Sequence, residues 1–197
     1  MSLTRVYNSC TTANMRNFKT EGIIIKRRNV HEADRILTVL TKEYGKLQIN
    51  ARGVRRITSK RASHIELLNY TQFSLYKGSS LPILVEAQMI EGFSNIKNDL
   101  NKIGFAYHIC ELIDGLCPEN QEQHQVFDLL KLTLERLAKG EENSLIIIHE
   151  FEIDLLSFLG YWHKGKDSSL IDTQQFIEHI LERKLKSHQI FSRLYRY

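Results

Sequence analysis

The apolar and polar positions of this chain follow two different periods. Before about residue 93, apolar residues alternate with polar ones or form short β-branched runs, as in EGIIIKRR (21–28) and KLQINARG (46–53). A period of two is typical of β-strands with a buried face. After residue 93, apolar residues recur every three or four positions, as in residues 126–137, which is typical of amphipathic helices. The pattern therefore predicts an N-terminal β half and a C-terminal helical half.

The N-terminal half is predicted to hold five strands and one short helix. The strands are expected at residues 21–28, 35–45, 46–53, 70–80 and 81–93, and the helix within residues 58–68. The segment KEYG (42–45) predicts a hairpin between the second and third strands. The fifth strand is expected to place four apolar side chains on one face: Ile83, Val85, Ala87 and Met89. This number and order of elements fit a small closed or partly open barrel such as the OB-fold.

The C-terminal half is predicted to hold four helices. Apolar stripes mark the first two, which end at Pro118 and at Gly140. The third, residues 144–160, is bounded by a serine and a glycine, and its apolar first turn indicates a buried element. Asp172 with Gln175 forms a capping-box-like start for the fourth. The predicted fold class is therefore α+β, with a disordered extension over residues 1–18, an OB-fold barrel over 19–93 and a helical domain over 94–197.

The sequence contains no recognisable catalytic or metal-binding constellation. The glycine-rich phosphate-binding motifs are absent, and the His-Glu pairs at 31–32 and 149–150 lack the second histidine of a zinc-protease helix. Glu111 and Asp114, one helical turn apart, are interpreted as a solvated helix edge. The protein is therefore predicted not to be an enzyme and to use neither a metal nor a cofactor.

The cysteines and the hydropathy pattern predict a cytoplasmic setting. Cys110 and Cys117, seven residues apart in a helical pattern, are interpreted as reduced core thiols, because an odd and sparse set of three cysteines does not suit a disulfide framework. No apolar run approaches the roughly 18 to 20 residues that span a bilayer, so no membrane association is predicted.

The modest net charge of +4 hides an asymmetry between the two halves. Residues 1–92 contain 15 Lys and Arg against 7 Asp and Glu, whereas residues 93–197 contain 12 against 16. A basic half joined to an acidic half indicates a polyanion-binding module attached to a part with another role. Several cations within reach of successive phosphates release condensed counterions, which is the main source of nucleic-acid affinity. The candidate DNA-binding residues lie in the first three strands and their loops: Lys26, Arg27, Arg28, Arg35, Lys42, Lys46, Arg52, Arg55, Arg56, Lys60 and Arg61.

Polar and aromatic neighbours extend this candidate surface. Gln48 and Asn50, between Lys46 and Arg52, are candidates for hydrogen bonds to phosphate or base. The aromatic side chains considered as stacking platforms for a single strand are Tyr44, Phe73 and Tyr76. The alternative interpretation is that this surface is ordinary solvated basic charge and binds no nucleic acid.

The chain carries an ordered series of motifs that begins with Glu-x-Asp-Arg-Ile-Leu-Thr at 32–38, Gly-Lys at 45–46, and Ala-Arg-Gly-x-Arg-Arg at 51–56. This series resembles the bacterial recombination mediator family RecO. LYKGSSLPILVEAQMIEGF resembles the family's fourth and fifth strands, FEIDLLSFLGY its helix ending in Leu-Gly-Tyr, and FIEHILERKLKS its closing helix. The resemblance spans roughly residues 20 to 190.

The resemblance implies an OB-fold followed by a helical domain, and a cytoplasmic bacterial protein that associates with the nucleoid when active. It also implies binding of single- and double-stranded DNA, annealing of complementary strands, and work with RecR and the single-stranded-DNA-binding protein to load RecA. The DNA contacts at matched positions would be Lys26, Arg28, Arg35, Lys46, Arg52, Arg55 and Arg56. Many members carry a four-cysteine zinc module after Leu-Gly-Tyr. Here WHKGKDSS runs directly into the closing helix, so a shortened form without zinc is expected.

Two further function classes stay open at this point. One is an adaptor whose acidic helical domain docks proteins while the basic barrel only localises it. The other is an RNA-binding OB-fold module, because phosphate contacts alone do not distinguish RNA from DNA.

Overall fold

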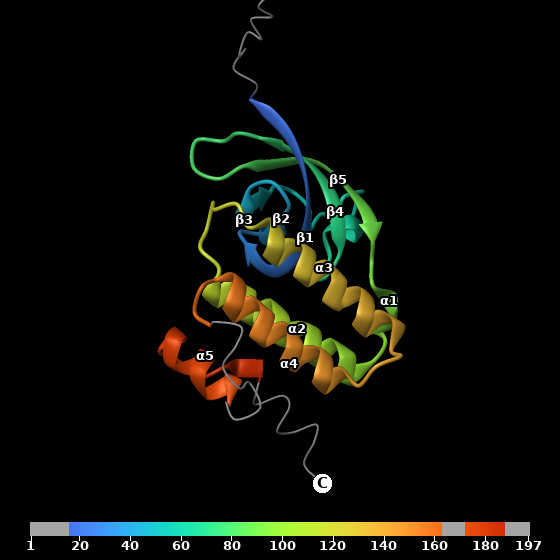
Figure 1. Cartoon of the computed structure of the whole chain (residues 1–197). Coiled ribbons are helices and arrows are strands. Elements are labelled where there is room, and N and C mark those ends of the chain that lie inside the picture. The colour runs from blue at the N-terminus through green and yellow to red at the C-terminus, as the bar shows by residue number, and fades with distance from the viewer. Residues whose placement is uncertain (1–15, 163–171, 188–197) are drawn as a thin grey trace, which may run out of the picture.

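We describe a computed structural model of the chain, which places residues 16–162 and 172–187 (Figure 1). Five strands form the N-terminal half: β1 (Asn17–Val30), β2 (Asp34–Thr41), β3 (Gly45–Ala51), β4 (Tyr70–Tyr76) and β5 (Ile83–Glu91). A short 3₁₀ helix, η1 (Ala62–Ile65), lies between β3 and β4. The helices are α1 (Ser94–Lys97), α2 (Leu100–Leu116), α3 (His124–Lys139), α4 (Ser144–Phe158) and α5 (Thr173–Leu181).

The five strands close into a barrel in the order β1-β2-β3-β5-β4. Neighbouring strands of the barrel are antiparallel, except that β3 and β5 are parallel where Asn50 pairs with Ile83. The predicted hairpin is confirmed, since β2 and β3 pair from Arg35 with Ala51 to Thr41 with Gly45. A five-stranded barrel with a helical turn between β3 and β4 is the OB-fold, as the strand pattern predicts.

The apolar run of β1 is continuous because both faces of this strand are buried. Ile24 points into the barrel interior, where it packs with residues such as Phe73. Ile23 and Ile25 belong instead to the core shared with the helices, together with Leu40. Strands that lose the alternation of apolar and polar residues are those covered on both sides. The described residues therefore form two apolar cores, one inside the barrel and one between the barrel and the helices.

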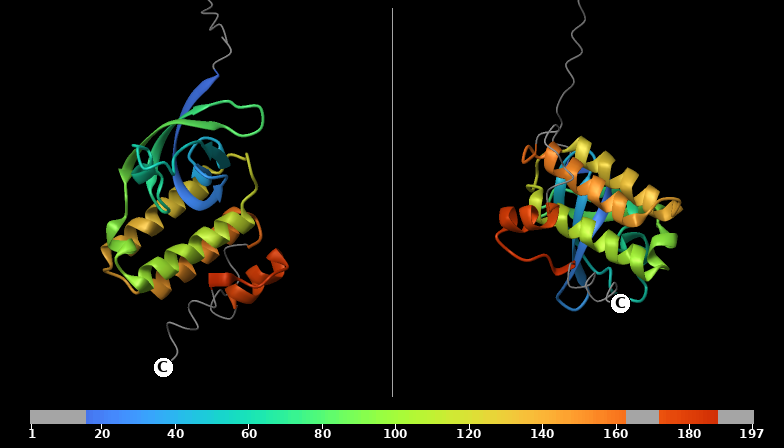
Figure 2. Two further views of the ribbon diagram at one scale, coloured as in Figure 1. Left: turned by 180° about the vertical axis from the view of Figure 1, so that it is seen from behind. Right: turned by 60° about the horizontal axis from the view of Figure 1, so that its bottom comes forward.

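The helices pack on one side of the barrel, and α5 lies beside α2 and α4 on the side away from it (Figures 1 and 2). At the contact between the two halves, the Tyr70 ring of β4 lies 6.1 Å from the Phe127 ring of α3, measured between centroids. The Nζ of Lys131 lies 5.1 Å from the centroid of the same Tyr70 ring. Aromatic and cation–π contacts of this kind add to the burial of apolar surface.

Several detailed predictions about the helical half need correction. The α4 helix starts one residue earlier than it would with Ser144 as its N-cap, because Asn143 is the cap and accepts from the Leu145 N–H. Leu145 and Ile146, in the first turn that was expected to be buried, are each 54% exposed. The predicted cap of the last helix is confirmed, since the Asp172 side chain accepts from the Gln175 N–H at 3.1 Å.

The prediction for the face of β5 is wrong for Val85. Irregular pairing between Ser74 and Leu75 inserts an extra residue in β5, so Leu84 rather than Val85 points into the barrel. Val85 is 49% exposed, whereas Met89 keeps the same face as Ala87 and is 42% exposed. An inserted residue of this kind reverses the alternation of faces and is not visible in the sequence period.

The described part of the chain includes no helix long and apolar enough to cross a bilayer. Cys110 and Cys117 are free and buried, as predicted. Burial raises the pKa of the Cys110 thiol to about 12 and that of the Cys117 thiol to about 11, so neither is a thiolate at neutral pH. Residues 1–15 of the predicted extension lie outside the described residues, whereas Asn17 and Phe18 belong to β1.

Candidate nucleic-acid interface

One end of the barrel carries a loop, residues 52–61, which we call the basic loop. Its sequence RGVRRITSKR contains five Lys and Arg and no acid. The loop is anchored to the turn that joins β1 and β2. The Gly53 N–H donates to Asp34 Oδ1 at 2.7 Å, and the Arg55 N–H donates to the Ala33 carbonyl at 3.0 Å. Val54 is buried in the barrel core, so the loop is held by packing as well as by hydrogen bonds.

The rest of the basic loop is a series of hydrogen-bonded turns. The Arg56 N–H donates to the Gly53 carbonyl at 3.3 Å, and the Ser59 N–H donates to the Arg56 carbonyl at 2.9 Å. The Arg61 guanidinium then ties the end of the loop to β5, donating to the Leu84 carbonyl at 2.8 Å and to the Arg52 carbonyl at 2.9 Å. Arg61 was predicted to contact DNA, but its guanidinium is used inside the protein, where these hydrogen bonds stabilise the loop.

The other four cations of the basic loop are exposed: Arg52, Arg55, Arg56 and Lys60. The Arg55 guanidinium donates to the backbone carbonyl of His31, at 3.2 Å. Within residues 16–162 and 172–187, no carboxylate pairs with any of these four side chains. Their charge is thus available to an anion without first breaking an internal ion pair.

Two hollows border the basic loop and share Lys60 and Arg61. The larger, of about 620 Å³, is lined by Asp34, Arg52, Gly53, Arg56, Thr58, Ser59, Lys60 and Arg61. The smaller, of about 350 Å³, reaches across β4 and β5 and includes Lys19, Gln72 and Gln88. Both are shallow and lined largely by polar groups, which suits an extended polyanion better than an apolar small molecule.

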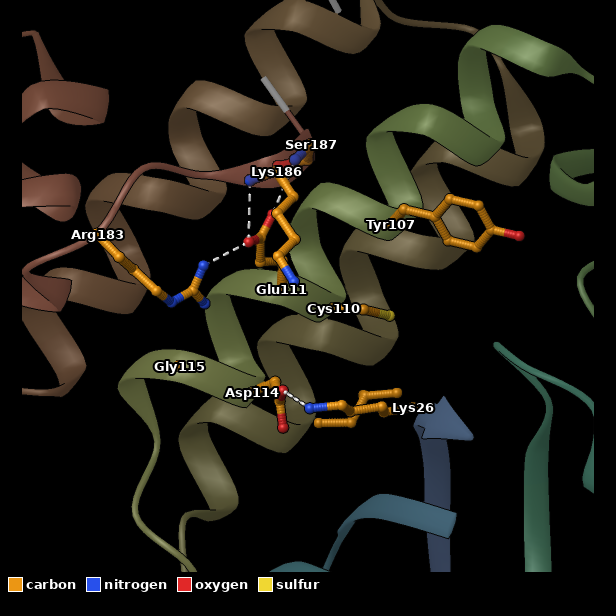
Figure 3. A pocket seen from close by; sticks show the side chains of 10 residues that line it. Lys26, Tyr107, Cys110, Glu111, Asp114, Gly115, Arg183, Lys186 and Ser187 are labelled. Carbon is orange, nitrogen blue, oxygen red and sulfur yellow. Dashed lines mark hydrogen bonds and ion pairs between the residues drawn. The ribbon is translucent and has the colours of Figure 1, made fainter. Parts of the chain in front are cut away.

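Lys26 lies elsewhere, where the barrel meets α2 (Figure 3), and Lys46 reaches the same end of α2. The Lys26 Nζ is 2.6 Å from Asp114 Oδ2, and the Lys46 Nζ donates to the Asp114 carbonyl at 2.5 Å. Lys46 is only 5% exposed. Its ammonium interacts with the last turn of α2, where a cation complements the helix dipole. The burial of Lys46 therefore contradicts its predicted position on an open DNA-binding face, and Gln48 is likewise engaged, donating to Glu119 at 2.6 Å.

The same region corrects the interpretation of Glu111 and Asp114 as a solvated helix edge. The Glu111 carboxylate accepts from the Arg183 guanidinium at 2.7 Å and from the N–H groups of Lys186 and Ser187 at 3.1 and 2.9 Å (Figure 3). Burial alone would raise the pKa of Glu111, but these donated hydrogen bonds lower it to about 2. Glu111 and Asp114 therefore fasten other parts of the chain to α2.

Arg27 and Arg35 share one acid, Glu66, which follows η1. Arg27 forms an ion pair with this carboxylate, and the Arg35 Nη1 lies 3.4 Å from its Oε1. Arg35 also donates to Asn29 Oδ1 at 3.1 Å. These two arginines thus have part of their charge compensated inside the protein.

The remaining candidates, Arg28 and Lys42, are exposed but lie at opposite ends of the barrel. Arg28 pairs with Ile36 near the start of β2, at the end that carries the basic loop. Lys42 lies in the turn after Thr41, at the far end of β2. The structure therefore brings Arg28 and the basic loop to one end, and separates them from Lys42, Lys26 and Lys46.

Neither Phe73 nor Tyr44 is placed with the basic loop, whereas Tyr76 is half-buried and pairs with Ile83 of β5. Phe73 is fully buried inside the barrel, so its prediction as a stacking platform is wrong. Tyr44 is 42% exposed, but it lies in the turn between β2 and β3 with its ring 5.1 Å from that of Phe18. Sequence reasoning also overlooked Ile57, an apolar residue of the basic loop whose exposed fraction is 105%.

A buried polar network in the helical half was also missed. His108 Nε2 lies 2.7 Å from Glu152 Oε1, and His108 Nδ1 lies 2.8 Å from Ser187 Oγ. All three side chains are at least nine-tenths buried. The network joins α2, α4 and the segment after α5, so we assign it to holding that segment in place. Within the described residues no group of three or more potential ligands could hold a metal ion.

Comparison with known protein families shows which family the chain belongs to. The family described as "Recombination protein O N terminal" matches residues 15–93, and "Recombination protein O C terminal" matches residues 97–163. The chain belongs to the RecO family. The two matched regions correspond to the barrel and to the helices α2 to α4.

Individual RecO relatives support this assignment. A DNA repair protein RecO from Dehalococcoides mccartyi is 40% identical over 145 residues, which are 74% of this chain and 57% of the relative. One from Acetivibrio thermocellus is 37% identical over 147 residues, 75% of this chain and 59% of the relative. One from Roseiflexus is 38% identical over 146 residues, 74% of this chain and 51% of the relative. The matched part therefore spans between half and three-fifths of the length of these RecO proteins.

Proposed function

We propose that this chain binds DNA through the basic loop and anneals complementary strands in recombinational repair. Its membership in the RecO family and the name of its relatives, DNA repair protein RecO, support this role. The observation that carries the proposal is the exposure of Arg52, Arg55, Arg56 and Lys60 on an anchored loop that contains no acid. Because these cations have no competing carboxylate among the described residues, they are free to neutralise successive phosphates.

The proposed mechanism is electrostatic. Two single strands repel each other through their phosphates, and a cationic surface that binds both lowers this repulsion. Base pairing then provides the recognition, so the protein needs no sequence preference of its own. Binding should weaken steeply as salt is added, because counterion release supplies most of the affinity. No covalent step is involved, in keeping with a mediator that is not an enzyme.

The proposed partners are those of the RecO family as a whole. We include RecR and the single-stranded-DNA-binding protein as direct partners and RecA as the protein finally loaded on the single strand. Two exposed apolar side chains in the first turn of α4, Leu145 and Ile146, favour a protein-docking role for the helical half. In our proposal that role accompanies DNA binding by the barrel and does not replace it.

Annealing of two complementary labelled oligonucleotides tests the proposal. Wild type should accelerate annealing, and Arg55→Glu with Arg56→Glu should abolish the acceleration. The control is Lys139→Glu with Lys184→Glu, which changes the net charge equally on exposed residues of the helical half. If the control variant loses annealing as fully as the loop variant, the effect is one of net charge, and the loop is not the DNA-binding site.

The two alternative functions give different results in the same experiment. An adaptor working through its helices would show little annealing by wild type, and the loop variant would keep its protein partners. An RNA-binding module would prefer an RNA strand over a DNA strand of the same sequence in competition. For the proposed function we expect no such preference for RNA.

A further inference from the structure

Ile57 occupies an unusual position in the basic loop. A single exposed isoleucine is ordinary on a protein surface, so its exposure alone indicates little. Here the exposed fraction of 105% means that essentially every face of the side chain meets solvent. In the same loop Val54 is 1% exposed, so this segment buries one of its β-branched residues and projects another. The contrast indicates that Ile57 has no role in holding the loop together.

The backbone presents Ile57 in a defined direction. The hydrogen bond of 2.9 Å from the Ser59 N–H to the Arg56 carbonyl closes a four-residue turn, in which Ile57 is the first of the two corner residues. Corners of such turns normally hold Pro, Gly, Asn, Asp or Ser, for reasons of backbone conformation and local hydrogen bonding. A β-branched side chain is also stiff at χ1, so it loses little rotamer freedom when something packs against it.

The residues around Ile57 indicate what kind of partner could bind it. Arg55 and Arg56 precede it, Lys60 follows, and a hollow of about 620 Å³ borders the same turn. A protein partner with an apolar pocket would have to carry acidic groups all around that pocket. A nucleic acid combines these features in one molecule, since phosphates lie beside the apolar faces of the bases. In a single strand those faces are accessible without the cost of opening a duplex.

We propose that Ile57 packs against the face of an unstacked base while its basic neighbours hold the flanking phosphates. This inference rests on the proposed function, and it adds a non-electrostatic contact that favours single strands over duplex. The arginines attract either form of DNA, whereas an apolar contact with a base face is available only where the base is unstacked. The isoleucine thus takes the role that aromatic platforms have in other single-strand binders.

The experiment compares the variants Ile57→Asn and Ile57→Phe with Arg55→Glu plus Arg56→Glu, on a single-stranded oligonucleotide and on its duplex. We expect Ile57→Asn to weaken single-strand binding about five- to tenfold and duplex binding less than twofold, since burying an isoleucine contributes at this level. Ile57→Phe should retain single-strand binding. The arginine variant should weaken both forms. Ile90→Asn, at another exposed isoleucine of the barrel, is the control and should change neither.

Two further measurements distinguish the contact from a general effect. A 2-aminopurine in the single strand should brighten when wild type binds, because its stacking is interrupted, and it should brighten less with Ile57→Asn. The salt dependence of binding should have the same slope for both proteins, because no phosphate contact is removed. Equal losses on single strand and duplex, or a changed slope, would overturn the base contact and indicate a change in loop conformation.

The outcomes separate the inference from the proposed function. If the arginine variant binds DNA as wild type does, the proposed function fails. If the arginine variant is defective and Ile57→Asn is normal, only the role of Ile57 fails. A basic loop with one apolar tip also suits an anionic membrane surface. Ile57-dependent binding to phosphatidylserine vesicles, without any effect of Ile57→Asn on oligonucleotides, would overturn the base contact in favour of lipid.

Discussion

Two groups of cations on the same barrel differ in what surrounds them. Lys26 and Lys46 face the last turn of α2, and both interact with Asp114. The cations of the basic loop face solvent, and no carboxylate among the described residues pairs with Arg52 or Arg56. In the sequence both groups look alike, since each adds positive charge to the same basic stretch. The structure shows that one group joins the two halves of the protein and the other is available to a ligand.

The difference teaches that the number of cations is a poor guide to a nucleic-acid interface. A cation with an internal acid partner must exchange that partner for a phosphate, and the exchange releases little net energy. A cation without such a partner exchanges only counterions and water, and their release is favourable. The effective interface therefore depends on where the acids are, and Asp114 and Glu66 lie far from their partners in the sequence.

The largest expected effect comes from two glycines, Gly45 at the start of β3 and Gly53 in the basic loop that follows it. Gly45 and Gly53 both have positive φ, of 65° and 66°. A Cβ at Gly45 would lie 1.6 Å from the Gln121 carbonyl oxygen, whereas at Gly53 the nearest atom, in the Arg56 side chain, is 3.8 Å away. We expect Gly45→Ala to destabilise the protein by about 3 kcal/mol or more, through backbone strain and overpacking, and Gly53→Ala by about 1 kcal/mol, through strain alone.

Urea denaturation measures both values. Equal losses of stability at the two glycines would mean that the contact between the barrel and the helical half is packed no more tightly than the basic loop. That result would contradict the structural difference drawn between the two regions. Gly53→Ala also tests the loop itself. Its effect on DNA binding should be small provided that the Asp34 bond to the residue 53 N–H is kept.

The next effect concerns a buried cation against an exposed one. Lys46→Met removes the hydrogen bond to the Asp114 carbonyl and should cost about 2 kcal/mol of unfolding free energy, as for other hydrogen bonds to charged groups. Single-strand affinity per folded molecule should stay within about twofold of wild type. Arg56→Met should do the opposite, with a stability change below about 0.5 kcal/mol and clearly weaker DNA binding.

Denaturation and oligonucleotide titration of the same two proteins check this contrast. A tenfold loss of affinity in folded Lys46→Met would contradict the assignment of Lys46 to the junction.

A smaller effect, with a defined pH window, is expected at Glu111. Its pKa is lowered to about 2 in the folded protein from an ordinary value of 4.5. Its stabilisation is therefore fully present above about pH 5 and is lost as the pH falls through the folded pKa, because the unfolded state takes up the proton first. Glu111→Gln should cost about 1 to 2 kcal/mol at pH 7, and the difference from wild type should shrink towards pH 2.

The measurement is the urea midpoint of both proteins between pH 7 and pH 3, with hydrogen exchange at the Lys186 and Ser187 amides. Faster exchange at these two amides in Glu111→Gln is expected, since they donate to its carboxylate. A stability difference that grows as the pH falls would have the wrong sign for this account of Glu111. DNA binding should not change, because the residue lies outside the basic loop.

Much of this fold was predictable from sequence, because periodicity reports burial directly. The number and order of the strands, the change of period near residue 93 and the cap at Asp172 all follow from local patterns. The run GIIIK of β1 looked like an ordinary strand, and only the structure showed that Ile23 and Ile25 form part of the core with the helices. The extra residue that exposes Val85 is a matter of pairing, which no local pattern specifies.

The site was predictable in composition and not in geometry. The sequence located the basic stretch, but it could not show that Lys46 is buried or that Arg61 donates to two backbone carbonyls. Both depend on chain segments that meet only after folding. The exposure of Ile57 had one overlooked signal, since an isoleucine stands alone among polar and charged residues in RRITSKR and has no periodic partner.

The most direct test of the central claim is the salt dependence of single-strand binding in two matched double variants. Arg55→Gln with Arg56→Gln removes two cations from the basic loop, and Lys26→Gln with Lys46→Gln removes two from the junction. For single strands the slope of log affinity against log salt changes by about 0.7 per phosphate contact, so the loop variant should lose about 1.4 from its slope. The junction variant, once shown to be folded, should keep the wild-type slope. An unchanged slope in the loop variant, or an equal loss in the junction variant, would contradict the claim that the cations of the basic loop, and not those of the junction, bind DNA.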